Sequence, residues 1–189
     1  MNLLNGAYLN SENGTEGEYC YGASVIRANC NYTEIGIKDT YRSMIKPVTW
    51  FLGGHSTNSA TADTFYTAER GSTVYEGRPT STTENKHIGL MYPSDYGYSV
   101  LASSCARTTN LGSYRSSSCA GQSWLYLGSE EWTLTPRSSD NSIVFMVSEG
   151  LYSDDACIGY SVRPVLYLDS SVYVIDGNGT MSDPYIIGM

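Results

Sequence analysis

The chain is 189 residues long, carries a net charge of −8 and has a hydrophobic fraction of 41%, which suits a single globular domain. Its 11 Lys and Arg residues form no run, so the composition argues against binding to nucleic acid or to an anionic membrane surface. The 17 tyrosines, with abundant Ser, Gly and Asn, are typical of binding surfaces, although a tyrosine-rich β-protein without such a surface would have the same composition.

The first third of the chain predicts little regular structure. Residues 1–34 are rich in Gly, Asn and Tyr and are interpreted as irregular. A helix is predicted over residues 37–52, because apolar residues recur there at helical spacing, and Pro47 limits its length. Residues 53–63 predict a loop, and residues 65–70 predict one or two helical turns.

From residue 71 onward, short apolar segments alternate with Gly, Pro, Ser and Asn, a pattern typical of short strands and turns. Residues 93–97 predict the turn that closes the first strand, and residues 98–101 predict the start of a short helix or a strand. Strands are predicted over residues 87–92, 123–127, 131–135, 143–147, 162–168 and 171–175, and a turn over residues 176–180. The sequence therefore predicts a loop-rich α+β fold with a dominant antiparallel sheet of short strands and one or two helices.

The five cysteines indicate the redox compartment. Cys20 and Cys30 form one local pair, and Cys105 and Cys119 form another, each in a loop rich in Gly, Ser and Asn. We interpret both pairs as disulfides, each of which stabilises the fold by about 3 kcal/mol; the alternative is four reduced, buried thiols. Cys157 would then remain as a thiol. Because the N-terminal residues do not resemble an export signal, two disulfides predict an extracellular domain that derives from a longer precursor.

The sequence offers little catalytic chemistry. It lacks the motifs of serine hydrolases, zinc metalloproteases and nucleotide-binding proteins. His55 could act as a general base, but no orienting carboxylate is identifiable, so a solvated loop histidine is the favoured interpretation, and His87 is interpreted as a strand-edge residue. We therefore predict that the protein is not an enzyme.

Acidic residues in the last third of the chain raise the question of a cation site. Residues 176–180 with Asp183 superficially resemble a calcium loop, but the closing bidentate Glu is absent, so a Gly-rich turn is favoured. Asp154 and Asp155 could bind a cation if other oxygens converged on them, although solvated loop residues are the simpler interpretation. We predict no metal ion and no other cofactor.

An ordered series of motifs connects the chain to a known family. The motifs are TWFLGG (49–54), AERG (68–71), IGLMYPSDYG (88–97), WLY (124–126), WTLTPRSS (132–139), VFMV (144–147), GYSVRPVLYL (159–168) and DGNGT (176–180) with DPY (183–185). Together with the Cys105 and Cys119 pair, they resemble the C-terminal domain of pilin-like surface proteins from gut Firmicutes. The resemblance implies a C-type-lectin-like fold for residues 38–189, preceded by an extension, residues 1–37, that would follow a pilin-type helix.

The same resemblance extends to the variable proteins of diversity-generating retroelements, which mutate adenines in a C-terminal tract. Asn codons altered in this way yield Ser, Asp, Tyr, Ile, Thr, Ala, Gly and Cys, among others, and residues 139–143 and 153–161 contain only Asn and residues of this set. The sugar-binding motifs of calcium-dependent lectins and the reactive cysteines of formylglycine-generating enzymes are absent, so neither activity is implied.

Residues 138–161 are therefore predicted to be the contact surface of a ligand-binding, adhesive domain at the cell surface. The predicted ligand contacts are Asp140, Asn141, Ile143, Tyr152, Asp154, Asp155, Cys157 and Tyr160. Trp132 and Arg163 are predicted to be structural, because an Arg at the end of an apolar strand needs a loop carbonyl or a carboxylate as acceptor.

The predicted partner is a protein or a glycan, and the isolated domain is expected to be a monomer because its charge of −8 opposes association. A structural pilus subunit without a dedicated ligand site is the alternative, with assembly into a pilus in the full-length form. An enzyme is the third and least favoured possibility.

Overall fold

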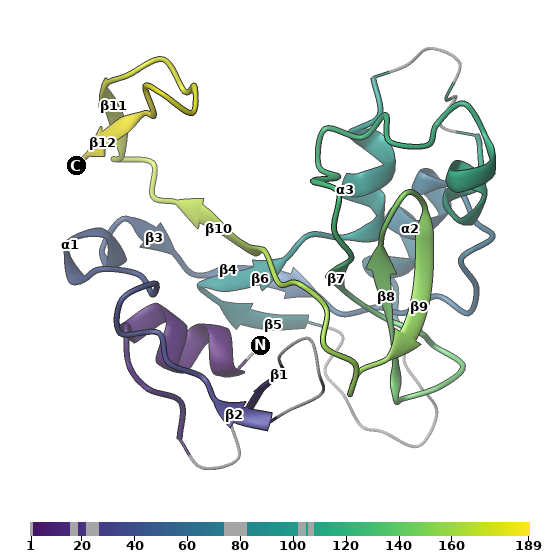
Figure 1. The fold of residues 1–189 in the computed structure, drawn as a ribbon, viewed down its shortest axis with the longest axis horizontal. Helices are drawn as coiled ribbons and strands as arrows, with labels where there is room; N and C mark the ends of the chain where they lie inside the picture. Colours follow the sequence, from purple (N-terminus) through teal and green to yellow (C-terminus); the bar gives the residue numbers. More distant parts are fainter. Residues whose placement is uncertain (1, 16–18, 22–26, 74–82, 102–104, 106–107) are drawn as a thin grey trace.

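The computed structural model describes residues 2–15, 19–21, 27–73, 83–101, 105 and 108–189 (Figure 1). Its helices are the π-helix η1 (Leu4–Tyr8), α1 (Asp39–Arg42), α2 (Ala62–Glu69), α3 (Pro93–Tyr98) and the 3-10 helix η2 (Leu111–Ser116). Its strands are β1 (Tyr19–Tyr21), β2 (Arg27–Asn29), β3 (Ile45–Lys46), β4 (Val48–Phe51), β5 (Thr83–Lys86), β6 (Ile88–Leu90), β7 (Glu131–Pro136), β8 (Ile143–Val147), β9 (Leu151–Asp155), β10 (Pro164–Leu168), β11 (Tyr173–Asp176) and β12 (Ile186–Gly188). No helix in this described part is long and apolar enough to cross a membrane.

The strands form five small antiparallel sheets. Two sheets have three strands, in the orders β3–β10–β6 and β7–β8–β9, and the other three are the pairs β1–β2, β4–β5 and β11–β12. The protein thus belongs to the α+β class, as predicted. The expectations of a dominant sheet and of one or two helices are wrong, since the described residues contain five short helices and no sheet of more than three strands. Gly, Ser and Asn interrupt the chain so often that neither kind of element grows long.

The main core lies between the β7–β8–β9 sheet and the helices α2, α3 and η2 (Figure 1). Phe65 of α2 meets Phe145 of β8 edge to face, with ring centroids 5.1 Å apart. Tyr96 of α3 and Tyr114 of η2 are fully buried beside them, and Tyr96 donates its hydroxyl to the carbonyl of Ser148 at 3.2 Å. This core is the scaffold on which the candidate site is built.

Most of the predicted strands are confirmed, but they differ in burial: β8 packs apolar side chains on the core, whereas every residue of β11 is exposed. Those predicted over 87–92, 131–135, 143–147, 162–168 and 171–175 correspond to β6, β7, β8, β10 and β11. The helical turns predicted over residues 65–70 belong to α2, which begins earlier because the Thr61 hydroxyl caps it by accepting the N–H of Thr64 at 3.3 Å.

The helix predicted over residues 37–52 is wrong beyond its first turn. Only α1 is helical there, and β3 and β4 follow on either side of Pro47, which cannot donate an N–H to a continuing helix. Trp50 is buried in β4 and donates its indole N–H to the carbonyl of Lys86 at 2.9 Å. A Cβ on Gly89 would lie 2.5 Å from the indole ring, so only glycine fits there. Contacts with β5 and β6 therefore override the helical spacing.

Two other local predictions are also wrong. Residues 93–97 form α3 in place of a turn, since a proline starts the helix and the Asp95 carboxylate accepts the N–H of Tyr92 at 2.9 Å. Residues 123–127 form a turn in place of a strand, and the carbonyl of Leu125 accepts a side-chain hydrogen bond instead of a strand partner.

Asn5 of η1 and a hydrogen bond from Arg42 of α1 to the carbonyl of Asn10 both attach the residues before position 38 to the main body. The Oδ1 atom of Asn5 accepts the backbone N–H groups of His87 and Ile88, both at 2.9 Å, and its Nδ2 atom donates to the carbonyl of Ile88 at 2.7 Å. Asn5 thereby satisfies backbone groups of β6 as a neighbouring strand would, and it holds η1 against the β3–β10–β6 sheet.

The C-terminal hairpin, which comprises β11, β12 and the turn between them (residues 173–188), extends from one end of the molecule beyond β10 (Figure 1). Among the described residues, β11 and β12 pair only with each other. Gly177 and Gly179 have φ angles of +88° and +79°, which confirms the Gly-rich turn predicted over residues 176–180. The exposed apolar side chains of the hairpin are those of Tyr173, Val174, Ile175, Met181, Tyr185 and Ile186.

Candidate functional site

The predicted contact tract, residues 138–161, folds mainly into the β8–β9 hairpin. Its facing residue pairs are Ile143 with Asp155, Val144 with Asp154, Phe145 with Ser153, Met146 with Tyr152 and Val147 with Leu151. Because side chains alternate between the two faces of a strand, the face that carries Phe145 packs on the core and the face that carries Tyr152 lies outward. One face of the hairpin therefore belongs to the core, and the other face forms part of the surface.

The outer face of the β7–β8–β9 sheet carries a pocket of about 270 Å³, which we call the outer pocket. It is lined by Arg115, Glu130, Met146, Ser148, Tyr152, Ser153, Asp154 and Tyr160. Met146 of β8 pairs with Tyr152 of β9 on one side and with Trp132 of β7 on the other. The three strands of one sheet therefore place an aromatic ring on each side of an apolar side chain.

Tyr160 and Asp154 form a fixed pair in the outer pocket. The Tyr160 hydroxyl donates to Oδ2 of Asp154 at 2.7 Å, and the Tyr160 ring meets Trp132 edge to face with centroids 4.9 Å apart. Donation to the Asp154 carboxylate raises the pKa of Tyr160 to about 12. Tyr160 therefore stays neutral at physiological pH, with its ring held by Trp132 and its hydroxyl held by Asp154.

Arg115 lies at the opposite end of the pocket, on η2. Its Nη1 atom donates to the Tyr152 hydroxyl at 3.4 Å, and its Nε atom is 3.9 Å from a carboxylate oxygen of Glu149. Gly150 brings η2 this close to the β8–β9 turn, since a Cβ there would lie 3.2 Å from the backbone nitrogen of Arg115 and 3.3 Å from the carbonyl oxygen of Leu111. The small residue at the turn thus lets η2 contribute a cation to the pocket.

The structure brings three of the predicted ligand contacts together, namely Tyr152, Asp154 and Tyr160. The other predicted contacts, Asp140, Asn141, Ile143, Asp155 and Cys157, do not line the outer pocket. Asp140 accepts the backbone N–H and the hydroxyl of Ser142, both at 2.9 Å, and Asp155 accepts the N–H of Cys157 at 3.0 Å, so both carboxylates stabilise turns. Asn141 and Cys157 are exposed, and Ile143 faces Asp155 across the hairpin.

Sequence reasoning missed five residues that line the outer pocket, namely Arg115, Glu130, Met146, Ser148 and Ser153. The alternation of side chains in the predicted strand at 143–147 could have placed Met146 on the outward face. No local signal identifies Arg115 or Glu130, because η2 and the start of β7 reach the pocket only through tertiary packing.

The two residues predicted to be structural lie beside the pocket. Arg163 donates to the carbonyl of Leu125 at 2.7 Å and to Oε1 of Glu131 at 2.5 Å, and the Glu131 side chain is only 5% exposed. Trp132 packs against Tyr160, as described above. Arg163 therefore joins the 123–127 turn to the start of β7, next to the pocket residue Glu130.

Both predicted disulfides are present. Cys20 bonds to Cys30 and Cys105 bonds to Cys119, with Cα–Cα distances of 5.0 Å and 5.2 Å. Cys105 and Cys119 are buried in the main core, whereas Cys157 belongs to neither disulfide and is exposed.

The described residues contain no cluster of three or more His, Cys, Asp or Glu side chains that could hold a metal ion. His55 lies in the loop at 53–63, where its Nδ1 atom is 2.7 Å from the carbonyl oxygen of Thr57 and its ring centroid is 4.8 Å from that of Phe65. These contacts orient the imidazole toward its own loop.

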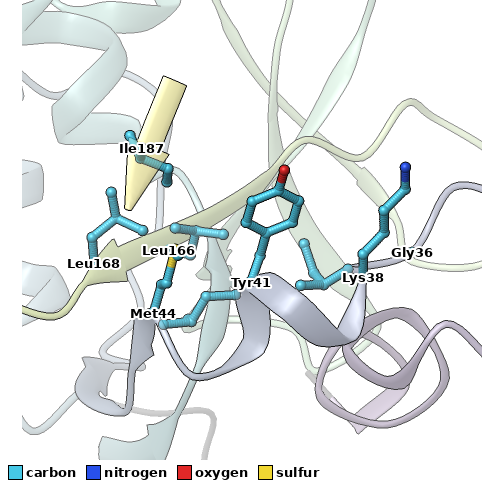
Figure 2. Close-up of a pocket in the computed structure, with 9 residues that line it drawn as sticks. Gly36, Lys38, Tyr41, Met44, Leu166, Leu168 and Ile187 are labelled. Atoms are coloured by element: carbon cyan, nitrogen blue, oxygen red, sulfur yellow. The ribbon is translucent and has the colours of Figure 1, made fainter. Parts of the chain in front are cut away.

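A second cavity, of about 450 Å³, lies between α1, β3, β10 and β12, and we call it the apolar groove (Figure 2). It is lined by Gly36, Ile37, Lys38, Tyr41, Met44, Ile45, Leu166, Leu168 and Ile187. Figure 2 shows Met44, Leu166, Leu168 and Ile187 gathered at one end, with Lys38 at the other. The groove has few groups that could orient a ligand, and it lies outside the predicted contact tract, so the outer pocket is the stronger candidate site.

Comparison with known proteins gave no match: no protein-family model, no curated protein and no solved structure is significantly similar to the chain. The function is therefore argued from the site itself.

Proposed function

We propose that the protein is a ligand-binding domain displayed at the cell surface, and that it contacts its target through the outer pocket. The observation that carries the proposal is the convergence of Tyr152, Asp154 and Tyr160, from the tract expected to make contact, in one pocket on the outward face of a packed sheet. The two disulfides support an extracellular location.

The pocket has the composition of a binding surface. Tyr152 and Tyr160 offer aromatic area, and both hydroxyls are already held by hydrogen bonds, so binding orders few additional groups. Ser148 and Ser153 offer small polar groups that adapt to a ligand. The stable core beneath them lets the outward residues vary without loss of the fold.

The resemblance of the sequence motifs to a known family makes the proposal more specific. It suggests a C-type-lectin-like fold and a pilin-like surface protein in which the outward residues of 138–161 are hypervariable. The α+β class and the placement of a polar, outward face on an apolar scaffold support this interpretation.

A structural pilus subunit is the second candidate, and one observation favours it. The C-terminal hairpin exposes six large apolar side chains next to the apolar groove, and exposed apolar patches of this kind commonly contact other chains. Under this alternative the outer pocket would have no ligand.

Binding measurements on two matched double variants separate the candidates. A protein and glycan array first identifies a ligand for the wild type. Tyr152→Ala with Tyr160→Ala should then lower the affinity by about tenfold or more, since two aromatic anchors are lost, while the melting temperature changes little. The control, Tyr173→Ala with Tyr185→Ala in the C-terminal hairpin, should bind as the wild type does. Full binding by the pocket variant and lost binding by the control would overturn the proposal.

A further inference from the structure

The charges of the outer pocket are unevenly distributed. Its end near Tyr160 carries the carboxylates of Glu130 and Asp154, and among the described residues neither of them forms a salt bridge. The guanidinium of Arg115 lies at the Tyr152 end, where Glu149 offsets its charge at 3.9 Å. The Tyr160 end of the pocket is therefore anionic and lacks a cation of its own.

We propose that this end of the outer pocket binds a cationic group, the ammonium or guanidinium of a basic side chain on a protein partner. The inference rests on the proposed function, because it names the ligand chemistry of the same site. Neither carboxylate has a salt-bridge partner among the described residues, and the half-buried Asp154 attracts a cation more strongly than a fully solvated carboxylate would, while the exposed Glu130 adds a second negative charge.

The tyrosine rings favour the same ligand. The negative face of an aromatic ring attracts a cation, and Tyr152 and Tyr160 both line the pocket. The Asp154 carboxylate accepts the Tyr160 hydroxyl at 2.7 Å, and Glu130 lines the same pocket. A cation beside Asp154 would therefore contact a carboxylate and an aromatic ring, with the charge of Glu130 in the same pocket.

The anionic end of the pocket is separated along β9 from Tyr152, which Arg115 contacts. Tyr152 and Asp154 are two residues apart on one face of β9, so their side chains are separated by about 7 Å along the strand. Because Glu149 offsets the charge of Arg115 at the Tyr152 end, a cation is attracted mainly to the Asp154 end. The pocket of about 270 Å³ is smaller than the ~300–1,000 Å³ of sites that enclose drug-sized ligands, so it suits one side chain of a larger partner.

The protein as a whole supports a basic partner. Its net charge of −8 speeds the approach of a positively charged protein and slows that of an acidic one. An uncharged glycan gains nothing from this charge, so the two ligand classes differ in their dependence on salt.

The test uses NMR titration of the full chain with Nα-acetyl-lysine methylamide and Nα-acetyl-arginine methylamide. We expect saturable shifts at Asp154 and Tyr160 with a dissociation constant of about 1 mM, as suits one side chain. Nα,Nε-diacetyl-lysine methylamide has the same stem without the charge and should bind at least about tenfold more weakly. Raising the salt concentration from about 20 to about 200 mM should weaken binding of the charged probes.

Three charge variants locate the site. Glu130→Gln with Asp154→Asn keeps the hydrogen-bonding shape and should abolish the shifts, while Asp183→Asn, a charge change in the C-terminal hairpin, should leave them unchanged. Arg115→Gln should bind as well as the wild type or more tightly. Equal binding of the charged and acetylated probes, shifts outside the pocket, or no binding at millimolar concentration would each overturn the inference.

The inference and the proposed function can fail separately. If the ligand found by array carries no cationic group but is lost in the Tyr152→Ala, Tyr160→Ala variant, the pocket is a binding site and its predicted chemistry is wrong. If the basic probes bind while the array ligand is unaffected by that variant, the pocket prefers cations and the proposed function is wrong.

Discussion

The carboxyl group of Glu69 is completely buried at the end of α2. It accepts the backbone N–H of Ser94 at 3.0 Å and also the Ser94 hydroxyl, both at the start of α3, and Arg70 lies 3.2 Å away. Burial raises the pKa of Glu69 from 4.5 to about 7, although the hydrogen bonds from Ser94 oppose this shift. Two core helices are therefore joined through a group that titrates near neutral pH.

We expect the free energy of unfolding to fall as the pH rises from 4.5 to about 7. In this window the folded chain keeps a proton on Glu69 that the unfolded chain has lost, so the stabilisation present at low pH declines by about 3 kcal/mol in total. Glu69→Gln removes the titration, and chemical denaturation at two pH values should show a smaller difference for this variant. The pKa of Asp95 is also raised by burial, but Asp95 is present in both proteins and cancels. Identical pH dependence in both proteins would contradict this account.

Arg163, which is half-buried, pairs with the buried Glu131, and Oε2 of Glu131 has no hydrogen-bond partner among the described residues. We expect Arg163→Met to lower the free energy of unfolding by about 3 kcal/mol, because it leaves a buried carboxylate uncompensated. Glu131→Gln added to this variant should restore part of the loss. Arg115→Met is the matched control, since its pair with Glu149 is largely exposed and should contribute less than about 1 kcal/mol. Urea denaturation measures all three variants, and equal losses for Arg163→Met and Arg115→Met would refute the prediction.

At the scale of the element, sequence patterns predicted the strands that have a clear local pattern. They missed the elements whose structure depends on contacts with residues far away in the sequence. β8 was predictable because its apolar side chains face the core, and β7 and β10 were predictable from their short runs of apolar and β-branched residues. β9 was not, because only Leu151 is fully buried and its remaining side chains are polar. The helix at 37–52 failed because Trp50 is buried against Gly89, which lies in a separate strand.

The same limit applies to the outer pocket. Tyr152, Asp154 and Tyr160 could be predicted because they lie in one polar tract between apolar strands. Arg115 could not, because it reaches the pocket through the packing of η2 on Gly150. Glu130 could not either, because the register of β7 against β8 decides its position.

One disulfide joins Cys20 of β1 to Cys30, directly after β2, and the other lies in the main core. Without reductant, the intact mass should be lower by four hydrogens than after reduction, and one thiol, that of the exposed Cys157, should react with an alkylating reagent. Mass spectrometry before and after reduction gives both numbers. Three or more reactive thiols in the native protein would show that at least one disulfide is absent in solution.

At the scale of the whole molecule, the sheets differ in how far packing on the core stabilises them. β7, β8 and β9 pack on the main core, whereas β11 and β12 pair only with each other in the described structure. A two-stranded hairpin is marginally stable by itself, so backbone amides of residues 173–188 should exchange with deuterium at least about 100-fold faster than those of β8. Hydrogen exchange followed by mass spectrometry or NMR measures this. Similar protection in both regions would mean that the C-terminal hairpin unfolds only with the core.

Because of its exposed hairpin, the protein should also differ in solubility between low and high ionic strength. The apolar faces and strand edges of the hairpin could pair with those of another molecule. Each molecule carries a charge of −8, and repulsion between like charges keeps the molecules apart. That protection shrinks as the Debye length falls from about 30 Å in 0.01 M salt to about 3 Å in 1 M salt. Light scattering should therefore show monomers in dilute buffer and association in concentrated salt, and the neutral change Val174→Thr with Ile186→Thr should suppress that association. If this variant associates as readily as the wild type, a surface other than the hairpin brings the molecules together.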